Sequence, residues 1–249
     1  MKSEKKSYIN EAGLDPKRIP KHLGIIMDGN GRWAQKKSFP RVVGHKAGLD
    51  TLKEIVRESS NLGIEVLTVY AFSTENWKRP MEEVNFLMNL LIEYMIKEIK
   101  ELKSEGVIIN IIGEDENVPE NVKKVIQTAM EETKENKGMK FNIAFNYGGR
   151  AEIVSAIKKI SEELLDGKLK VENINEDFLN SKMYTSEDSD PDLIIRTGGE
   201  YRLSNFLVWQ SAYSELYFTE TMWPDFKKNE FRKALKDYSL RNRRFGGLT

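Results

Sequence analysis

Short apolar runs alternate with longer segments of helical periodicity along most of this 249-residue chain. The short runs have the length of buried strands, and apolar residues in the longer segments recur at the spacing of one helix face. Such alternation predicts a mainly parallel sheet covered by helices on both faces. The predicted strands are residues 22–29, 64–73, 107–113, 139–149, 192–199 and 214–220, and the predicted helices are residues 45–62, 81–103, 119–136, 150–166 and 228–242.

The chain is expected to form a single α/β domain around a central, mainly parallel six-stranded sheet flanked by helices. No repeat, low-complexity block or internal linker divides it, and a chain of this length can bury a sizeable core. Residues 1–18 are polar and are expected to form a loosely held N-terminal arm, which leaves residues 19–249 for the domain.

Composition removes several classes of protein. Lys and Arg total 39, as do Asp and Glu, so the net charge is zero and no bulk nucleic-acid binder is expected. The absence of cysteine excludes disulfides and thiolate chemistry, and two histidines cannot build a His-rich metal site. No apolar run has the length of a membrane span, and the N-terminus lacks a signal peptide, so a cytoplasmic protein is expected.

Four polar segments follow predicted strands directly. They read "DGNGRW", "STENWKR", "NYGGR" and "RTGGEYRLS", and all four are rich in polar residues, glycine or arginine. Ligands of open parallel sheets bind beyond the carboxyl ends of the strands. These four segments are therefore expected to meet at one site.

Asp28 stands at the mouth of the glycine turn in "DGNGRW". The run "GNGRWA" formally matches a dinucleotide fingerprint, but the second strand ends in "FSTENW", where Glu75 is a poor ribose ligand. A carboxylate beside those glycines would repel a pyrophosphate unless a divalent cation bridged the two. Mg²⁺ prefers such oxygen ligands, so Asp28, the glycine amides and Arg32 are interpreted as a Mg²⁺–diphosphate cradle. The alternative is a plain Asp-Gly turn or helix cap.

Further cationic residues suit additional phosphate groups. Arg41 and His45 lie in "RVVGHKAG", where His45 opens a helix, and Arg196, Arg202 and Ser204 surround the glycine turn of "RTGGEYRLS". A helix N-terminus favours anions, and arginine binds phosphate oxygens in bidentate fashion. Two anion sites and one metal predict two phosphorylated substrates. The alternatives are an ordinary helix cap and surface ion pairs.

The predicted helix at residues 81–103 is apolar around most of its circumference. A helix of this kind is buried in a core, or it lines an apolar cavity. Two diphosphate sites beside an apolar cavity would suit prenyl chemistry.

The chain resembles the cis-prenyltransferase family, specifically its undecaprenyl diphosphate synthases. The matching runs occur in family order from about residue 20 to the end: "HLGIIMDGNGRWA", "RVVGHKAG", "VYAFSTENWKRP", "NIAFNYGGRAEI", "DLIIRTGGEYRLSNFLVWQSAYSELYF", "WPDF" and "RRFGG". The resemblance implies a homodimer with a central parallel sheet and an apolar tunnel. It also implies Mg²⁺-dependent, repeated condensation of isopentenyl diphosphate onto farnesyl diphosphate, with undecaprenyl diphosphate, the precursor of the cell-wall lipid carrier, as the expected product.

The resemblance also implies roles for individual residues. Asp28 would position Mg²⁺ on a diphosphate, and Trp33 would border the allylic site. The residues that would hold the allylic diphosphate are Gly29, Asn30, Gly31, Arg32, Arg41 and His45. Those that would bind isopentenyl diphosphate are Arg196, Arg202 and Ser204. A mobile loop that closes over the substrates would contain Ser73, Thr74, Glu75, Asn76, Trp77 and Arg79.

Other roles implied by the family are less direct. Asn76 is the candidate for assisting proton removal, with a diphosphate oxygen as its rival, because an amide is a poor base. Glu215 would be a second metal-linked carboxylate, acting across the dimer interface, and Arg244 and Gly246 would reach the partner subunit's site. Tyr201 stands where many bacterial relatives have His, so no metal role is assigned to it.

Two other functions are weighed against this interpretation. A non-catalytic supporting subunit of a heteromeric prenyltransferase would typically lack Asp28 and the arginines, which are intact here. The hypothesis of a nucleotide-dependent oxidoreductase is supported by "GNGRWA" alone.

The expected tunnel wall and floor include Met139, Phe141, the surroundings of Leu91 and the helix at 45–62. Contact with a membrane is expected only at its periphery, through the lipid product.

Overall fold

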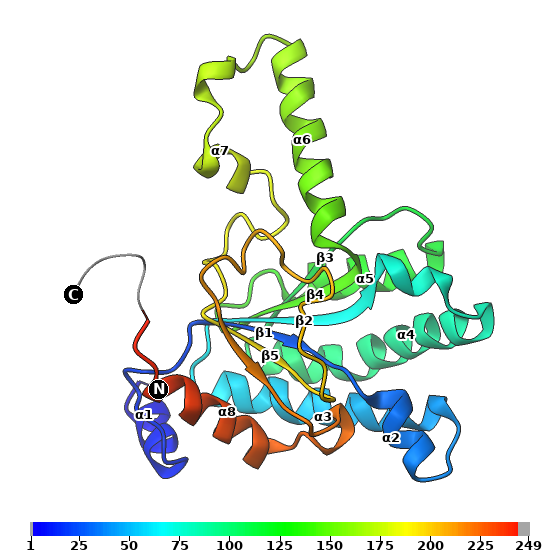
Figure 1. The fold of residues 1–249 in the computed structure, drawn as a ribbon, viewed down its shortest axis with the longest axis vertical. Helices are drawn as coiled ribbons and strands as arrows, with labels where there is room; N and C mark the ends of the chain where they lie inside the picture. The colour runs from blue at the N-terminus through cyan, green and yellow to red at the C-terminus, as the bar shows by residue number, and fades with distance from the viewer. Residues whose placement is uncertain (1, 244–249) are drawn as a thin grey trace.

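The computed structural model describes residues 2–243 and contains a sheet of six strands (Figure 1). The strand order is β3-β4-β2-β1-β5-β6, and every neighbouring pair is parallel. The predicted α/β class with a six-stranded parallel sheet is therefore confirmed. The strands are β1 (His22–Ile26), β2 (Val66–Ser73), β3 (Ile108–Ile112), β4 (Lys140–Tyr147), β5 (Leu193–Arg196) and β6 (Glu215–Phe218).

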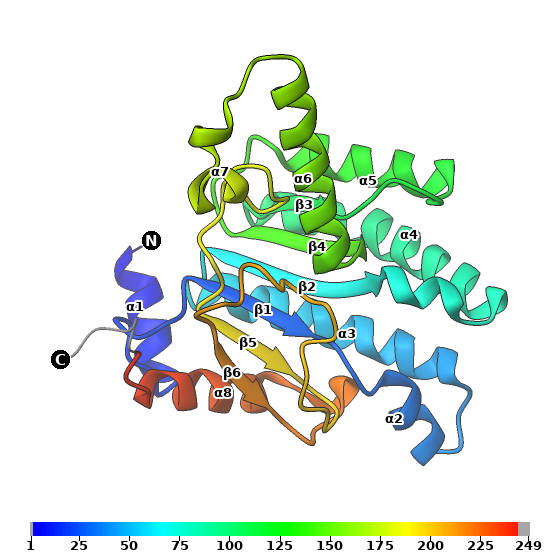
Figure 2. The same ribbon diagram turned by 45° about the horizontal axis from the view of Figure 1, so that its top comes forward.

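The helices cover one face of the sheet and also form a projecting arm. Figure 2 shows α3 lying along the sheet behind β1 and β2, whereas α6 and α7 extend away from the body of the molecule. No helix within residues 2–243 is both long enough and apolar enough to span a bilayer. The helices are α1 (Lys2–Glu11), α2 (Asn30–Lys36), α3 (Arg41–Asn61), α4 (Met81–Ser104), α5 (Glu120–Thr133), α6 (Gly149–Leu165), α7 (Glu176–Asn180) and α8 (Lys228–Leu240), with short 3-10 helices η1 (Thr74–Lys78), η2 (Val171–Asn173) and η3 (Trp223–Asp225).

Three helices begin directly after a proline. Pro40, Pro80 and Pro119 precede α3, α4 and α5, with φ values of −56°, −51° and −60°. The fixed φ of proline suits the start of a helix, where its missing N–H costs no hydrogen bond. As a result α3 begins at Arg41, four residues before the predicted helix, and Arg41 and His45 share its first two turns.

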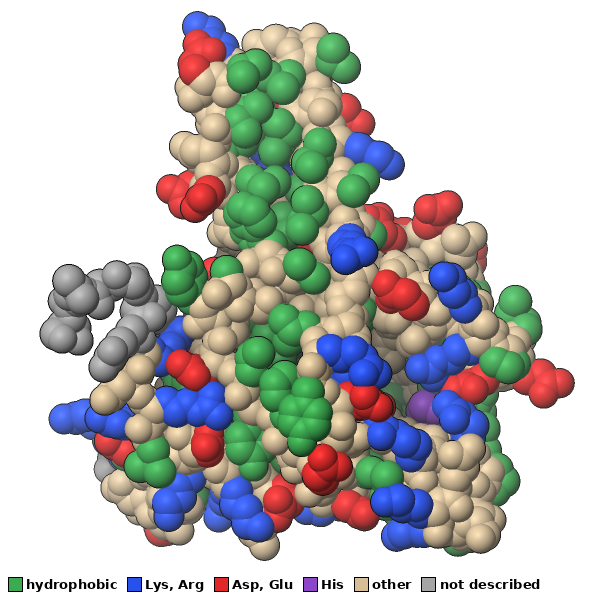
Figure 3. All heavy atoms as spheres, in the orientation of Figure 1, with side chains coloured by type: hydrophobic (Ala, Val, Ile, Leu, Met, Phe, Trp, Pro, Cys, Tyr) green, Lys and Arg blue, Asp and Glu red, His purple; other side chains and the backbone are tan. Residues whose placement is uncertain are grey.

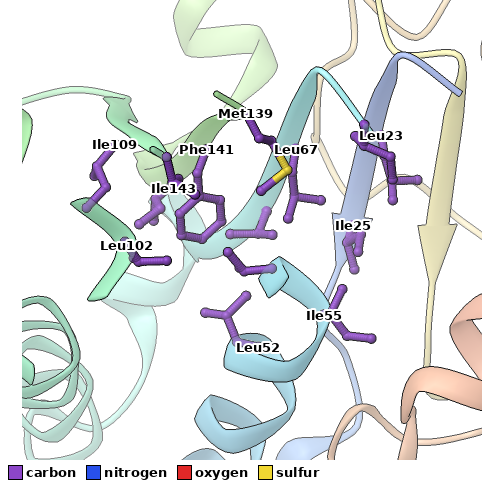
Figure 4. Close-up of a cluster of buried hydrophobic side chains, with 14 of the residues drawn as sticks. Leu23, Ile25, Leu52, Ile55, Leu67, Leu102, Ile109, Met139, Phe141 and Ile143 are labelled. Atoms are coloured by element: carbon purple, nitrogen blue, oxygen red, sulfur yellow. The ribbon is translucent and has the colours of Figure 1, made fainter. Parts of the chain in front are cut away.

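The main core lies between the sheet and the helices on its covered face. Figure 4 shows Leu23 and Ile25 of β1 and Phe141 of β4 pointing toward the same interior as Leu52 of α3 and Leu102 of α4. All five side chains are buried. Burial of apolar area at roughly 25 cal/mol per Å² makes this interface the chief stabilising contact of the fold.

The opposite face of the sheet carries a smaller apolar cluster. Ile26 and Ile194 of the central strands pack there against Phe206 and Leu207, which belong to the loop after β5. Phe206 also stacks on Tyr70 with the ring centroids 4.8 Å apart. A loop, and not a helix, packs on this face, so the predicted covering of both faces by helices is corrected. The same loop continues into the ligand-binding edge.

The N-terminal segment is not a loosely held arm, so that prediction is corrected. Residues Lys2–Glu11 form α1, and Ile9 and Leu14 are buried in the main core. The Tyr8 hydroxyl donates to Oε2 of the buried Glu58 at 2.6 Å and accepts from Lys228 Nζ at 2.6 Å. A few apolar residues among many charges were enough to anchor a segment whose composition is polar.

Replacing Ile9 by alanine should lower the free energy of unfolding by about 2–4 kcal/mol, because a buried isoleucine side chain is lost. Urea denaturation followed by circular dichroism measures this change. Asn10→Ala is the matched control, since Asn10 is exposed in the same helix and should change stability by less than about 0.5 kcal/mol. If Ile9→Ala were as stable as the parent protein, the prediction of a loosely held N-terminal arm would stand.

Candidate active site

The register of the parallel sheet brings the ends of three strands to one edge. Ile26 of β1 is paired with Tyr70 of β2 on one side and with Arg196 of β5 on the other. The segments that follow these three strands therefore meet, as predicted for three of the four post-strand motifs. A cavity of about 610 Å³ opens at this edge, with polar residues at its mouth and apolar residues deeper inside.

Asp28 occupies the centre of the mouth. Its Oδ2 accepts from Arg196 Nη2 at 2.9 Å, and its Oδ1 lies 3.2 Å from Arg32 and accepts from the Gly29 amide at 2.6 Å. Burial raises the pKa of the Asp28 carboxyl, but the hydrogen bond and charge of Arg196 and the charge of Arg32 outweigh it and lower the pKa overall. Asp28 is therefore an ionised carboxylate lining the cavity.

The glycine turn fixes this carboxylate at the mouth. Gly29 is the N-cap of α2 with φ of 102°, a left-handed conformation that favours glycine, and no side chain caps the helix. Asp28 is thus not a helix cap, which removes that alternative. A Cβ on Gly31 would lie 2.7 Å from Cζ of Arg41, so this glycine gives the arginine room to lie against α2.

Arg196 links the two predicted anion sites. Its side chain is 5% exposed, and Nη1 donates to Ser204 Oγ at 2.7 Å and to the Arg202 carbonyl, while Nη2 binds Asp28. Its Nε has no hydrogen-bond partner among the described residues. Arg202 itself is largely exposed and pairs with Glu200, as the surface ion-pair alternative anticipated. The buried charge of Arg196 is therefore the firmer anion-binding group.

At the other side of the cavity mouth, Glu83 lies close to two arginines and a histidine. Its Oε1 lies 2.9 Å from Arg79, 3.4 Å from Arg41 and 3.7 Å from His45 Nε2. Burial lowers the pKa of His45 to about 4, and the charges of Arg79 and Arg41 act in the same direction. His45 is thus a neutral hydrogen-bonding group, and its buried Nε2 has no hydrogen-bond partner within the part of the chain described. Glu83 is not among the residues predicted from the sequence, although an acidic residue in the first turn of a predicted helix was a signal.

The segment after β2 is a short 3-10 helix, η1. Asn76 and Ser73 cap it reciprocally, with the Ser73 amide donating to Asn76 Oδ1 at 3.2 Å. Trp77 Nε1 donates to Asn146 Oδ1 at 2.7 Å, and the Trp77 ring meets Phe72 edge to face. Thr74 lies beside Gly148, where a Cβ would come within 2.7 Å of the threonine Oγ1. Of the predicted loop residues, those at the cavity are Ser73, Glu75, Asn76 and Arg79.

The deeper part of the cavity is apolar. Its lining residues come from α3, α4 and the sheet: Leu49, Leu52, Leu87, Leu90, Leu91, Tyr94, Phe72, Ile143 and Phe145. The predicted contribution of Leu91 and of α3 agrees with this geometry. Met139 and Phe141, predicted for the tunnel wall or floor, are absent from this lining and are buried in the main core. Trp33 is also away from the lining, with Lys37 Nζ 4.1 Å from the centre of one face of its ring.

Glu215 is not brought to Asp28 within one chain. It begins β6 opposite Leu193, at the far end of the strands from Asp28, and its Oε2 lies 2.9 Å from Arg241. The exposed Tyr201 donates to Glu220 at 3.1 Å. Arg244 and Gly246 lie outside the described residues. Residues 2–243 contain no cluster of three or more His, Cys, Asp or Glu that could hold a metal.

One ionised carboxylate nevertheless fits Mg²⁺, because this cation takes one or two protein carboxylates and completes its shell with substrate phosphates. Arginines and a carboxylate above an apolar cavity suit a ligand with a phosphorylated head and an apolar chain. The fold and site together define an α/β enzyme that handles amphiphilic phosphate esters.

Comparison with known proteins identifies the family. The family model described as "Putative undecaprenyl diphosphate synthase" matches residues 26–246, and the chain belongs to this family of isoprenyl transferases. An isoprenyl transferase of Clostridium tetani is 52% identical over 94% of this chain and 92% of its own length. That of Clostridium perfringens is 54% identical, over 93% and 91% respectively. The predicted enzyme class and family are thereby confirmed.

Solved structures agree with this assignment. Lavandulyl diphosphate synthase from Lavandula x intermedia, in complex with dimethylallyl diphosphate, has a TM-score of 0.91 and 36% identity, and the match covers 93% of this chain and all of that one. A probable undecaprenyl diphosphate synthase from Campylobacter jejuni has a TM-score of 0.77 and 33% identity, covering 92% and 99%.

His45 should titrate near pH 4 in the folded protein, against 6.5 as its ordinary value. The unfolded chain then binds more protons between these two values, so stability should fall as the pH drops from about 6.5 to 4. NMR titration of the imidazole resonances measures the pKa, and Arg79→Gln should raise it by removing a nearby positive charge. His22 serves as the internal control in the same spectra. A midpoint near 6.5 would contradict the buried, neutral assignment.

Proposed function

We propose that the chain condenses isopentenyl diphosphate repeatedly onto farnesyl diphosphate and makes a long-chain Z,E-polyprenyl diphosphate, with undecaprenyl diphosphate as its product. The observation that carries the proposal is the position of Arg196, which touches both Asp28 and Ser204. One buried guanidinium thus stands between two groups suited to two separate diphosphates. The apolar cavity directly below provides room for a hydrocarbon chain.

The allylic diphosphate is placed over the α2 turn. The amides of this helix N-terminus, the guanidinium groups of Arg32 and Arg41 and the neutral imidazole of His45 supply its hydrogen-bond donors. Gly29, Asn30 and Gly31 form the backbone of the turn. Mg²⁺, held by Asp28 together with the substrate's own oxygens, would neutralise charge that develops on the departing diphosphate.

Isopentenyl diphosphate is placed at Arg196, Arg202 and Ser204. Its double bond attacks the allylic carbon, the allylic C–O bond breaks, and a new C–C bond forms. A proton then leaves the adjacent carbon and a new cis double bond remains. Asn76 Oδ1 already accepts the Ser73 amide, so a diphosphate oxygen is the better proton acceptor. Positioning and electrostatics supply the catalysis, and no covalent intermediate is required.

The growing chain extends into the apolar cavity between the sheet, α3 and α4. Its lining by leucines and aromatic residues favours hydrocarbon over water. We place the enzyme in the cytoplasm, with peripheral contact to a membrane because its product is a lipid.

The intact Asp28 and arginines argue against a non-catalytic supporting subunit. Glu75, the acidic residue after β2, accepts a hydrogen bond from Asn205, which argues against its use as the ribose ligand of a dinucleotide.

The partner we propose is a second copy of the chain. Figure 3 shows hydrophobic side chains gathered over the arm of α6 and α7, and Val154 and Ile157 of α6 are 52% and 50% exposed. An apolar face of this kind, on an arm that projects from the body, suits a subunit interface. Glu215, Arg244 and Gly246 would then act on the partner's site.

Asp28→Asn should lower polyprenyl product formation by about a hundredfold or more, because the carboxylate for Mg²⁺ is lost while the side-chain shape is kept. The assay uses radiolabelled isopentenyl diphosphate, farnesyl diphosphate and Mg²⁺, with chromatography of the product. Asp50→Asn removes an exposed carboxylate on α3, away from the arm, and should keep parental activity. Parental activity of Asp28→Asn, or a parent protein that makes no long product, would sink the proposal.

Val154→Asp combined with Ile157→Asp should convert a dimer into a monomer, because two charges would be buried at the interface. Sedimentation velocity measures the change. Ile96→Asp is the control, since Ile96 is 63% exposed on α4 and away from the arm. A parent protein that sediments as a monomer would contradict the proposed interface.

A further inference from the structure

The loop after β5 holds three non-glycine residues in the left-handed backbone region. Ser204, Asn205 and Leu207 have φ values of 49°, 65° and 43°. Such conformations cost free energy and persist where surrounding contacts determine them, often at functional sites. Asn205 lines the cavity beside Ser204, so its contacts bear on the site.

Asn205 joins three of the four post-strand segments. Its Nδ2 donates to Glu75 Oε1 at 2.8 Å, which reaches the segment after β2. Its Oδ1 accepts from the Arg150 amide at 2.9 Å, and its backbone carbonyl accepts from the Gly149 amide at 2.8 Å, which reaches the segment after β4. Asn205 itself follows Ser204 in the segment after β5.

The bond to Glu75 is made to a charged group. Burial raises the pKa of the Glu75 carboxyl, but the Asn205 amide and the hydroxyls of Ser73 and Thr74 outweigh it, so the pKa is lowered overall. A hydrogen bond to a carboxylate is stronger than one between neutral groups. Glu75 lies in η1 beside Asn76, so this bond ties the short helix to the loop after β5.

We propose that Asn205 is a positioning residue that locks η1 to the Arg196–Ser204 anion site. Ser204 Oγ accepts a hydrogen bond from the Arg196 guanidinium. The next residue, Asn205, holds η1 by donating to Glu75. The two substrate sites and the loop between them are thereby kept in register. This inference rests on the proposed condensation, in which both substrates must be aligned, so losing Asn205 should slow turnover more than it weakens binding.

Two replacements of Asn205 separate positioning from folding. Asn205→Gly suits φ of 65° without backbone strain and removes both side-chain bonds, so the chain should fold while kcat falls about tenfold. The KM for isopentenyl diphosphate should change by less than about threefold. Asn205→Asp keeps the shape and the Arg150 bond but places a carboxylate against Glu75, and kcat should fall at least as far.

The double variant Asn205→Asp with Glu75→Gln provides the rescue. The glutamine amide can donate to the new carboxylate, so kcat should recover about fivefold or more over Asn205→Asp alone. Hydrogen exchange of residues 73–78, followed by mass spectrometry, should speed up in both single Asn205 variants and return toward the parental rate in the double variant. Exchange in β3 should not change.

Parental kcat and parental exchange in Asn205→Gly would overturn the inference, as would a double variant no better than Asn205→Asp. The exchange experiment needs no substrate, so it tests the lock separately from the reaction. If the parent makes no polyprenyl product but exchange follows the expected pattern, the proposed function fails and the lock stands.

Discussion

The contact between Arg196 and Asp28 organises the ligand-binding edge. Arg196 is the last residue of β5, and its side chain is only 5% exposed, a position that is costly for a charge without partners. The parallel register sets Arg196 opposite Ile26, which brings Asp28 within 2.9 Å of it. The remaining donors on Arg196 hold Ser204 and the Arg202 carbonyl, so the loop after β5 is shaped by the same guanidinium.

Most cationic residues of the mouth have a carboxylate partner in the chain itself. Glu83 forms ion pairs with Arg41 and Arg79, and Glu200 forms ion pairs with Arg32 and Arg202. These pairs are partly exposed, so each contributes little to stability, but each restricts where its arginine can point. A diphosphate entering the mouth meets guanidinium groups that are already oriented, and it competes with carboxylates for them. Balanced composition and strong local anion binding are therefore compatible.

The sequence predicted the strands, their polar ends and the placement of Asp28 and Arg196 at one edge of the sheet, because these depend on local patterns and on one rule of parallel sheets. It did not predict how deep the cavity reaches. Phe141 and Ile143 lie on the same face of β4, yet Ile143 lines the cavity and Phe141 is core. Strand periodicity specifies a face but not a depth along it. Asn205 was missed because its partner Glu75 is 130 residues away, and Glu83 was missed because two of its three partners, Arg41 and His45, lie on another helix.

The helices α3 and α4 line the cavity, and both carry polar residues at the N-terminus, leucines further along and another ion-pairing residue beyond the leucines. Both begin at the mouth, where their N-termini favour anions, with Arg41 and His45 on α3 facing Glu83 on α4. Leucines from both helices follow and line the cavity. Beyond them Lys53 of α3 lies 2.7 Å from the buried Glu98 of α4. The apolar walls thus lie between two sets of ion pairs, one at each end. Every helix that follows a parallel strand starts at the carboxyl edge, so strand direction alone separates the diphosphate end from the hydrocarbon end.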